Sequence, residues 1–589
     1  MCGIVGYVSK NEDAKEVLYE SLKRLEYRGY DSSGLGVING EEFIIKKAVG
    51  KIANLEPLLE DIGKCSVGVG HTRWATHGNV SLKNAHPHIS QDILVVHNGI
   101  IENYKEIKDE LINRGIEFKS DTDTEVIVHL LALEIGSLFE KVKRVYKKLK
   151  GLYAFVALNL KGEVIGVRKG APLILGVGKD FNIVASDLNV LTPYTDKVIF
   201  LNDGEIFNLN SLEIIDENFR KIEKVLQKID NNFKVVYDKG NYKHYMLKEI
   251  EEQPEVVRKI LLSYQDLRIF EKLSISPNFL KEVKKIKIIA CGSSYYSGLI
   301  FKYFLNDLLE IDVDVVIASE AKYSTIFSKN DLVIAISQSG ETTDTLAALR
   351  YSKEKGSKIL SFVNVWGSSI ARESNDVIYT HAGPEKGVAS TKSLTAQILT
   401  LYLFGCYLAK IDDKRYENII EELKNIPSKI EEVININLED ALKILDKASG
   451  AIYIGRGISY PVATEGALKL KELSYIYAQG YAAGELKHGT IALIDKNTPT
   501  IAIVPKDETY EKALSNIQEI KAREGKVIAI SSEENIKVDV LIKVPKIKEV
   551  KLSPLLNLVV VQLISYYSSK NRGNDVDMPR NLAKSVTVE

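Results

Sequence analysis

A cysteine stands at position 2, where removal of the initiator methionine would leave its thiol beside a free α-amine. The unperturbed pKa is about 8.5 for a cysteine thiol and about 7.7–8.0 for an α-amine. The amine can therefore act as the general base for its own thiol, so that one residue supplies both nucleophile and base. On position alone, Cys2 is better explained as a small buried apolar residue at the start of a strand.

Groups that suit an amino-acid substrate follow along the chain. Arg73, within the run His71–Gly78 (HTRWATHG), offers a guanidinium that can grip a carboxylate with two hydrogen bonds. Asn98 and Gly99 end an apolar strand, where an amide and a backbone N–H could stabilise an oxyanion; such donors contribute about 2.7–4 kcal/mol each. Asp123 precedes a helical pattern and could hold an ammonium group, or simply cap the helix.

Histidines are dense in the same region, which raises the alternative of a metal site. They stand at His71, His77, His86, His88 and His97. No carboxylate or thiolate lies at a familiar zinc spacing from them. We therefore expect these histidines to make structural hydrogen bonds, and we predict no metal site.

Hydroxyl-rich turns follow three segments in the second half of the chain. They contain Ser337, Gln338, Ser339 and Thr342 after the apolar run ending at Ile336, Ser293 and Ser294 after the run ending at Ala290, and Ser390 after Val388. Each turn alone is equally well explained as a helix cap. Open α/β sheets bind ligands at the carboxyl ends of their strands, and helix starts bind phosphate, so the three turns together predict a phosphate site.

Ionisable side chains that could act on a bound molecule come later still. A helical pattern over Glu465–Gln479 puts Lys469 and Glu472 on one face, although a solvated ion pair would look the same. His488 lies in a glycine-bounded loop. The tail carries Lys584 and is rather apolar for a frayed end, which suggests that it docks.

The elements that must position these groups change character along the chain. Up to about residue 236, short β-rich runs dominate and two helical patterns, Ala14–Leu25 and Thr124–Leu133, interrupt them, which predicts a layered α+β domain. The strands are expected at Gly3–Val8, Gly34–Ile38, Ser66–Gly70, Ile93–His97, Tyr153–Leu158 and Val164–Arg168.

Beyond a polar stretch, apolar strands alternate with helices, as in a doubly wound α/β fold with a parallel sheet. This half looks doubled, because Lys287–Gly298 and Ala451–Pro461 share an apolar strand followed by a glycine turn and Ser-Tyr. We predict domains at 1–236, 248–425 and 426–574, with a linker at 237–247 and a C-terminal tail at 575–589.

Composition narrows the class of protein. A chain of 589 residues exceeds a single core of roughly 250–300 residues. The formal net charge of -1 gives no broad attraction to nucleic acid or to a membrane surface. Four scattered cysteines favour a reducing, cytoplasmic setting. The apolar segment Leu394–Ala409 is shorter than the ~20 residues needed to cross a bilayer, so we expect a buried helix.

The first domain resembles the class II glutamine amidotransferases, which are N-terminal-nucleophile hydrolases. The resemblance rests on Met1–Gly6 (MCGIVG), Tyr27–Gly34 (YRGYDSSG) and the HTRWATHG run. It implies that Cys2 attacks the glutamine amide and that Asn98 and Gly99 form the oxyanion hole. It assigns Arg73 and Asp123 to the substrate carboxylate and amine, Thr76 and His77 to the pocket wall, and Trp74 to a gate for ammonia.

The second half resembles the tandem SIS (sugar isomerase) domains of the glutamine–fructose-6-phosphate aminotransferases, up to the closing DVDMPRNLAKSVTVE. The resemblance implies a Schiff base between Lys584 and fructose 6-phosphate, with its phosphate on the hydroxyl-rich turns. It also implies proton transfer by Glu472 beside Lys469, and ring opening by His488 from the second subunit of a homodimer. One departure is Tyr477–Gly480 (YAQG), where the resemblance predicts His-Ala-Glu-Ala.

The implied substrates are L-glutamine and D-fructose 6-phosphate, and no metal or organic cofactor is expected. Two alternatives remain open. One is a class II amidotransferase with a different acceptor, against which the doubled lobes argue. The other is a sugar-phosphate sensor, which would have no need of Cys2, Glu472 and Lys584 together.

Overall fold

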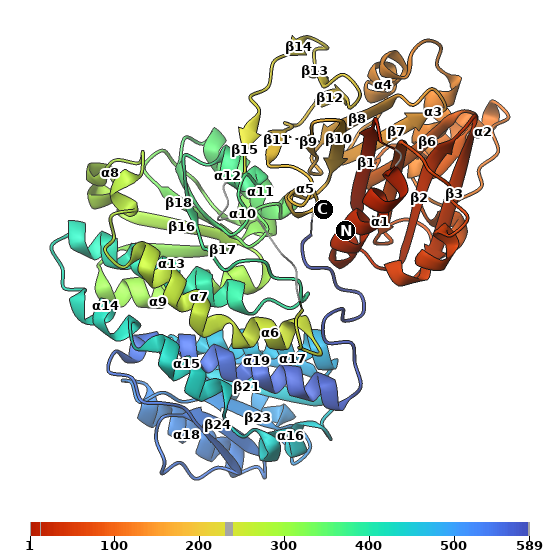
Figure 1. Cartoon of the computed structure of the whole chain (residues 1–589). Helices are drawn as coiled ribbons and strands as arrows, with labels where there is room; N and C mark the ends of the chain where they lie inside the picture. The colour runs from red at the N-terminus through yellow and green to blue at the C-terminus, as the bar shows by residue number, and fades with distance from the viewer. Residues whose placement is uncertain (1, 12, 230–238, 587–589) are drawn as a thin grey trace. The chain divides into compact units, whose positions relative to one another are not determined.

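The computed structural model describes residues 2–11, 13–229 and 239–586 (Figure 1). The chain divides into two compact units, Met1–Tyr237 with Ser585–Glu589, and Asp238–Lys584. The predicted linker at 237–247 begins outside the described residues, and its described part leads into helix α6 at Tyr245.

The first unit is built on two antiparallel sheets. Their strand orders are β15-β11-β9-β10-β1-β4-β2-β3 and β14-β13-β12-β8-β7-β6-β5. The strands are β1 (Gly3–Ser9), β2 (Ser32–Asn39), β3 (Glu42–Val49), β4 (Val67–Arg73), β5 (His88–Ser90), β6 (Ile93–Gly99), β7 (Tyr153–Asn159), β8 (Val164–Lys169), β9 (Ile174–Val177), β10 (Phe181–Ala185), β11 (Lys197–Phe200), β12 (Glu205–Asn208), β13 (Glu213–Ile215), β14 (Lys221–Ile222) and β15 (Gln227–Lys228).

Helices cover the outer faces of these sheets. Side chains from both sheets, among them Ile4, Val69, Val96 and Val156, form one buried core between the sheets. Helix α1 packs on β1 and β4, and helices α3 and α4 pack on the second sheet. The predicted layered α+β fold is confirmed, and the two predicted helices are α1 and α3. The helices are α1 (Ala14–Leu25), α2 (Tyr104–Asn113), α3 (Thr124–Leu133), α4 (Leu138–Tyr146) and α5 (Leu188–Leu191).

The second unit holds two parallel sheets with one topology. Their orders are β17-β16-β18-β19-β20 and β22-β21-β23-β24-β25, so each lobe follows the order 2-1-3-4-5. The predicted doubling is therefore confirmed. The strands are β16 (Lys285–Ala290), β17 (Asp312–Ile317), β18 (Leu332–Ser337), β19 (Lys358–Val363), β20 (Asp376–Tyr379), β21 (Gly450–Gly455), β22 (Tyr477–Ala482), β23 (Thr500–Ile503), β24 (Val527–Ser531) and β25 (Val540–Lys543).

Helices surround both sheets and join the lobes through a common apolar core (Figure 1). They are α6 (Tyr245–Glu251), α7 (Gln253–Tyr264), α8 (Pro277–Glu282), α9 (Gly292–Leu308), α10 (Ala321–Ser324), α11 (Thr343–Glu354), α12 (Ser369–Glu373), α13 (Lys392–Ile411), α14 (Glu417–Leu423), α15 (Ile426–Ile434), α16 (Glu439–Leu445), α17 (Ser459–Ser474), α18 (Tyr510–Lys521) and α19 (Pro554–Asn571). The predicted boundary at 425–426 falls between α14 and α15.

Two of these segments are long and apolar enough to cross a membrane by length and composition. They are Lys392–Ile411, which is α13, and Val550–Asn571, which contains α19. However, in the most apolar 18-residue stretch of each segment, 89% and 83%, respectively, is buried inside the structure. They are core helices of the second unit, as predicted for Leu394–Ala409.

One predicted helix is too long. The helical pattern over Glu465–Gln479 ends at Ser474, because Tyr475 takes a left-handed conformation with φ of 59°. The following residues form β22, which pairs in parallel with β21. The correction matters for the site, because Gln479 lies on an edge strand and not on the helix that carries Lys469.

The structure explains why glycine stands at position 480, in the segment Tyr477–Gly480 that differs from the family pattern. A Cβ atom on Gly480 would lie 2.4 Å from the Thr464 Cα atom in α17. Replacing Gly480 by alanine should therefore destabilise the second unit by about 1–3 kcal/mol, the usual cost of overpacking. The denaturation midpoint of the full chain measures this effect. Gly450→Ala in neighbouring β21 is the control, because its Cβ would only meet the Tyr477 carbonyl at 3.5 Å; equal midpoints would contradict the explanation.

Candidate active sites

The first candidate site lies where two strand ends meet in the first unit. Strand β1 pairs antiparallel with β4, with Gly3 opposite Thr72, and this register brings Cys2 beside Trp74. The Cys2 Sγ atom accepts a hydrogen bond from the Trp74 N–H at 3.2 Å. Burial raises the pKa of the Cys2 thiol, while Arg73 lowers it and Asp123 raises it. The thiol therefore needs a base before it can attack.

The predicted oxyanion donors come from the second sheet. Asn98 in β6 donates its side-chain amide to the Cys2 carbonyl at 3.0 Å. Gly99 has a φ of 106°, and a Cβ atom there would lie 2.2 Å from the Leu152 carbonyl, so only glycine fits. Asn98 thus lies beside the cysteine backbone, and Gly99 follows it at the end of β6.

The predicted substrate-binding side chains have other partners in this structure. Arg73 is buried and donates to the backbone carbonyls of residues 77, 78 and 79. Asp123 accepts a hydrogen bond from the Ile101 N–H at 2.9 Å and makes no side-chain cap on α3. The simple N-cap explanation is thus wrong for its side chain. Trp74 meets Tyr30 edge to face and His77 packs on Tyr104, whereas Thr76 is exposed.

The neighbouring histidines form a buried hydrogen-bond chain. His86 contacts the His71 ring at 3.0 Å, and Thr124 Oγ1 contacts both His86 and His97 at 2.9 Å. Burial lowers the pKa of His71 to about 3 and also lowers those of His86 and His97, so the rings are neutral. His71 Nε2 also lies 3.1 Å from the Asn98 side-chain oxygen. His71 therefore orients Asn98, a role that the sequence did not indicate.

The second candidate site lies at the carboxyl ends of β16 and β18. These are adjacent strands of a sheet with order 2-1-3-4-5, and the strand order reverses between them, where such sheets bind ligands. Ser293 and Ser294 begin α9 after β16. Ser337 ends β18, and its Oγ atom accepts the Gly340 N–H at 3.0 Å and contacts Thr342 Oγ1 at 3.1 Å.

The remaining hydroxyl-rich turn joins the same place. The Gln397 side chain in α13 donates to Ser294 Oγ at 3.0 Å, which ties α9 to the helix that follows the third turn. Ser390 in that turn contacts Ser393 Oγ at 2.7 Å. Val388 donates its N–H to the Asp577 carbonyl at 3.1 Å, so the tail docks on this turn. Gln338 and Ser339 lie in the loop between β18 and α11.

Helix α17 of the second lobe brings ionisable groups to this site. Lys469 contacts Glu472 at 2.5 Å and Glu465 at 3.5 Å, and the Lys469 side chain is only 1% exposed. Lys469 is therefore buried, whereas 21% of the Glu472 side chain is exposed. Ser293 in the first lobe donates to Glu465 Oε1 at 3.0 Å. Burial raises the pKa of Glu465 to about 7, so this carboxyl can hold a proton at neutral pH.

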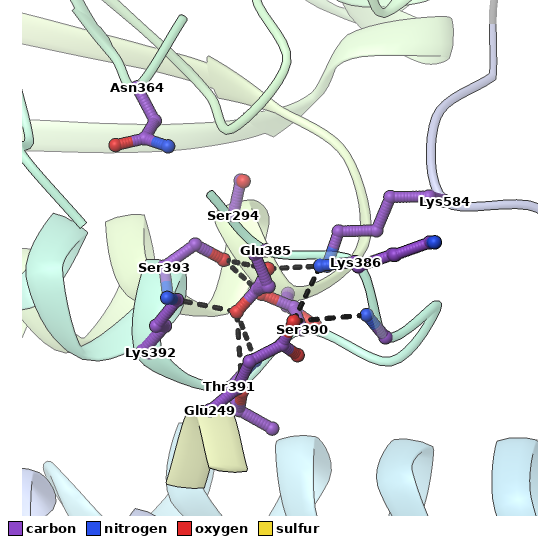
Figure 2. Close-up of polar contacts among 12 residues, drawn as sticks. Glu249, Ser294, Asn364, Glu385, Lys386, Ser390, Thr391, Lys392, Ser393 and Lys584 are labelled. Carbon is purple, nitrogen blue, oxygen red and sulfur yellow. Dashed lines mark hydrogen bonds and ion pairs between the residues drawn. The ribbon is translucent and has the colours of Figure 1, made fainter. Parts of the chain in front are cut away.

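Lys584 reaches the same unit from the C-terminal tail. Its amine pairs with Glu385, and the two side chains are 4% and 0% exposed (Figure 2). Glu385 is also one of the carboxylates that raise the pKa of Lys469. The sequence did not single out Glu385, whose only signal is its position shortly before the Ser/Thr-rich start of α13.

His488 is the one predicted ionisable residue that stays apart. It ends a short 3₁₀ helix, Ala483–His488, and its side chain is exposed. Among residues 2–11, 13–229 and 239–586, no hydrogen bond or ion pair joins it to Lys469, Glu472 or Lys584.

Comparison with known proteins agrees with the division of the chain into two units. Residues 71–193 match the glutamine amidotransferase domain, and residues 279–406 and 444–569 each match the SIS domain. The fold and these matches thus define a glutamine amidotransferase domain joined to tandem SIS domains.

Full-length relatives narrow the class. The chain is 45% identical to the glutamine–fructose-6-phosphate aminotransferase (isomerizing) of Aquifex aeolicus and 43% identical to that of Methanosarcina mazei, with all of each chain covered. A solved structure, the C-terminal domain of glucosamine-fructose-6-phosphate aminotransferase from Francisella tularensis, matches 58% of this chain and all of its own, with 38% identity and a TM-score of 0.56. The chain belongs to the glutamine–fructose-6-phosphate aminotransferase (isomerizing) family.

Proposed function

We propose that this chain transfers the amide nitrogen of L-glutamine to D-fructose 6-phosphate, giving D-glucosamine 6-phosphate and L-glutamate. The observation that supports this function most strongly is the presence of two separate sites, a thiol flanked by Arg73 and Asp123 and a buried amine at Lys584, in a chain that aligns with these relatives from end to end. The reaction is proposed to take place in the cytoplasm, without a metal or an organic cofactor.

In the glutamine half, the Cys2 thiol attacks the side-chain amide carbon after Met1 has been removed. The freed α-amine takes the thiol proton, which overcomes the raised thiol pKa. Asn98 and Gly99 stabilise the oxyanion, ammonia leaves, and water converts the glutamyl thioester to glutamate. Arg73 and Asp123 hold the substrate carboxylate and amine, Thr76 and His77 line the pocket, and Trp74 acts as the gate for ammonia.

In the sugar half, the phosphate lies on the hydroxyl-rich turns formed by Ser293, Ser294, Ser337, Gln338, Ser339, Thr342, Val388 and Ser390. Lys584 forms a Schiff base with C2 of the open-chain sugar, with loss of water, and ammonia then displaces the lysine nitrogen from C2. Glu472 moves the proton between C1 and C2, with Lys469 fixed beside it at 2.5 Å. A carboxylate suits this transfer once it is within hydrogen-bond reach of the migrating proton.

We further propose that the active enzyme is a homodimer that shares the sugar site. His488 is exposed and has no contact with the other catalytic groups in the described part of the chain. In the dimer it opens the sugar ring in the site of the second subunit.

Nitrogen tracing tests the function directly. With [amide-¹⁵N]glutamine and fructose 6-phosphate, we expect ¹⁵N-labelled glucosamine 6-phosphate and an equal amount of glutamate, both measured by mass spectrometry. Ribose and amino-acid acceptors offered in parallel serve as controls. Glutamate release with label on another acceptor would indicate a different amidotransferase, and sugar binding without glutamate release would indicate a sensor.

A further inference from the structure

Glu385 is a buried carboxylate that no step of the proposed mechanism uses. It lies in the loop before α13, and its side chain is 0% exposed. Its Oε1 atom accepts hydrogen bonds from the backbone N–H of Thr391 at 2.9 Å and of Ser393 at 3.0 Å. The Thr391 hydroxyl adds a third bond at 3.2 Å. One oxygen of Glu385 therefore caps the N-terminus of a 20-residue helix, where a negative charge is stabilised.

The second oxygen of Glu385 faces the tail. Oε2 accepts from the Ser393 hydroxyl at 2.5 Å and from the Lys584 amine. Figure 2 shows the Lys584 side chain extending from the tail toward Glu385, which lies beside the first turn of α13. Burial alone would raise the pKa of Glu385, but Lys584 and the Ser393 bonds outweigh it and lower that pKa to about 2. The group is a permanent anion, too weak a base to serve as a general base near neutral pH.

A second carboxyl group, that of Glu249, fixes the loop that contains Glu385. Glu249 in α6 accepts the backbone N–H groups of Lys386 and Gly387, the latter at 3.1 Å. A Cβ atom on Gly387 would lie 2.8 Å from Glu249 Oε2, so the loop packs tightly on this carboxyl. Asp577 of the tail caps α6 by accepting the N–H groups of Tyr245 and Met246, both at 2.9 Å. The loop, α6 and the tail therefore hold one another in place.

We propose that Glu385 is the positioning residue for the Lys584 amine. This inference rests on the proposed Schiff-base role of Lys584. A tail lysine has four rotatable bonds, and its amine must reach C2 in one geometry. Glu385 supplies a fixed, desolvated anion, itself anchored on α13, that holds the amine in the sugar-free enzyme. Misplacement by about 1 Å can cost roughly 10²-fold in rate. Glu385 therefore governs how fast the amine, after its proton has passed to solvent, adds to C2 of the ketone and forms the Schiff base with loss of water.

Trapping of the Schiff base tests this role. Wild-type enzyme is incubated with fructose 6-phosphate and borohydride, without glutamine, and the adduct on Lys584 is followed by peptide mass spectrometry. For Glu385→Gln, which keeps the size but loses the charge, we expect trapping to slow about 30- to 100-fold, with kcat for amino sugar lowered equally. The KM for fructose 6-phosphate should stay within about threefold, because Ser293, Ser294 and Ser337 of the other two hydroxyl-rich turns bond to partners other than Glu385.

A matched control separates positioning from stability. Glu422 is another buried carboxylate in the same unit, with Lys429 at 2.9 Å, and it lies outside the site. Glu422→Gln should lower the melting temperature without slowing the trapping. Glu385→Asp keeps the charge, so we expect faster trapping than in Glu385→Gln, and if the amide variant fails to fold, the aspartate variant should still trap more slowly than wild type.

The outcomes distinguish the positioning role of Glu385 from the Schiff-base role of Lys584. A folded Glu385→Gln or Glu385→Asp enzyme that traps sugar at the wild-type rate would overturn the positioning role while leaving the Schiff base intact. Absence of any Lys584 adduct in the wild-type enzyme, despite amino sugar formation, would overturn the Schiff base and the positioning role with it.

Discussion

Replacing Cys2 by alanine is expected to lower glutamine hydrolysis by about 10⁴-fold or more, the scale on which removal of a catalytic nucleophile acts. The Cys2 Sγ atom contacts the backbone N–H and carbonyl of Trp74, and neither of these groups can replace the thiol as a nucleophile. Glutamate release from glutamine measures the loss. Trapping of fructose 6-phosphate on Lys584 should stay within about twofold of wild type, because Cys2 belongs to the first unit and Lys584 to the second.

A second buried cysteine in the same unit provides the control. Cys65 is 4% exposed, and its backbone carbonyl accepts the Ala14 N–H. Cys65→Ala should leave glutamate release within about twofold of wild type, since only a small apolar contact is lost. Unchanged glutamine-driven amino sugar formation in the Cys2→Ala enzyme would show that another group is the nucleophile.

Much of the fold was predictable because its signals are local. The bounds of α1 and α3 coincide with the predicted segments, where apolar residues repeat with a clear period. The helices α2 and α4 were missed among the surrounding strand patterns. The false extension of α17 arose because the strand Tyr477–Ala482 has no Gly or Pro before Gly480. Only its pairing with β21 makes it a strand, and that pairing is not local.

The residues of the candidate sites also fall into two groups, those that local sequence patterns predicted and those that they did not. The spacing of Lys469 and Glu472 placed them correctly on one helix face, but it does not show that the neighbouring Glu465 contacts Ser293 of the first lobe. Glu385 could not be found from its neighbours, because its partner Lys584 lies 199 residues away in the sequence. Likewise, His71 supports Asn98 from another sheet. Residues that act by holding another side chain leave little signal in sequence, because their partners are brought together only by the fold.

Replacing Lys584 by arginine is expected to abolish the Schiff-base adduct and to lower amino sugar formation by about 10⁴-fold or more, comparable with loss of a nucleophile elsewhere. Arginine keeps the positive charge that Glu385 requires but cannot form a Schiff base under these conditions. Lys584→Ala should also lose the chemistry, and in addition it should destabilise the second unit by about 3–5 kcal/mol, because a buried anion is left unpaired.

Comparing these two variants separates chemistry from the ion pair. If Lys584 were needed only to pair with Glu385, the arginine enzyme would keep most of its activity and the alanine enzyme alone would fail. We expect both to lose the adduct in mass spectrometry, and only the alanine enzyme to unfold at lower denaturant. Lys429→Ala is the matched control, because it breaks the ion pair with Glu422 outside the site. It should lower stability while leaving the Lys584 adduct intact, since a charge lost at a distance from Glu385 does not move the amine.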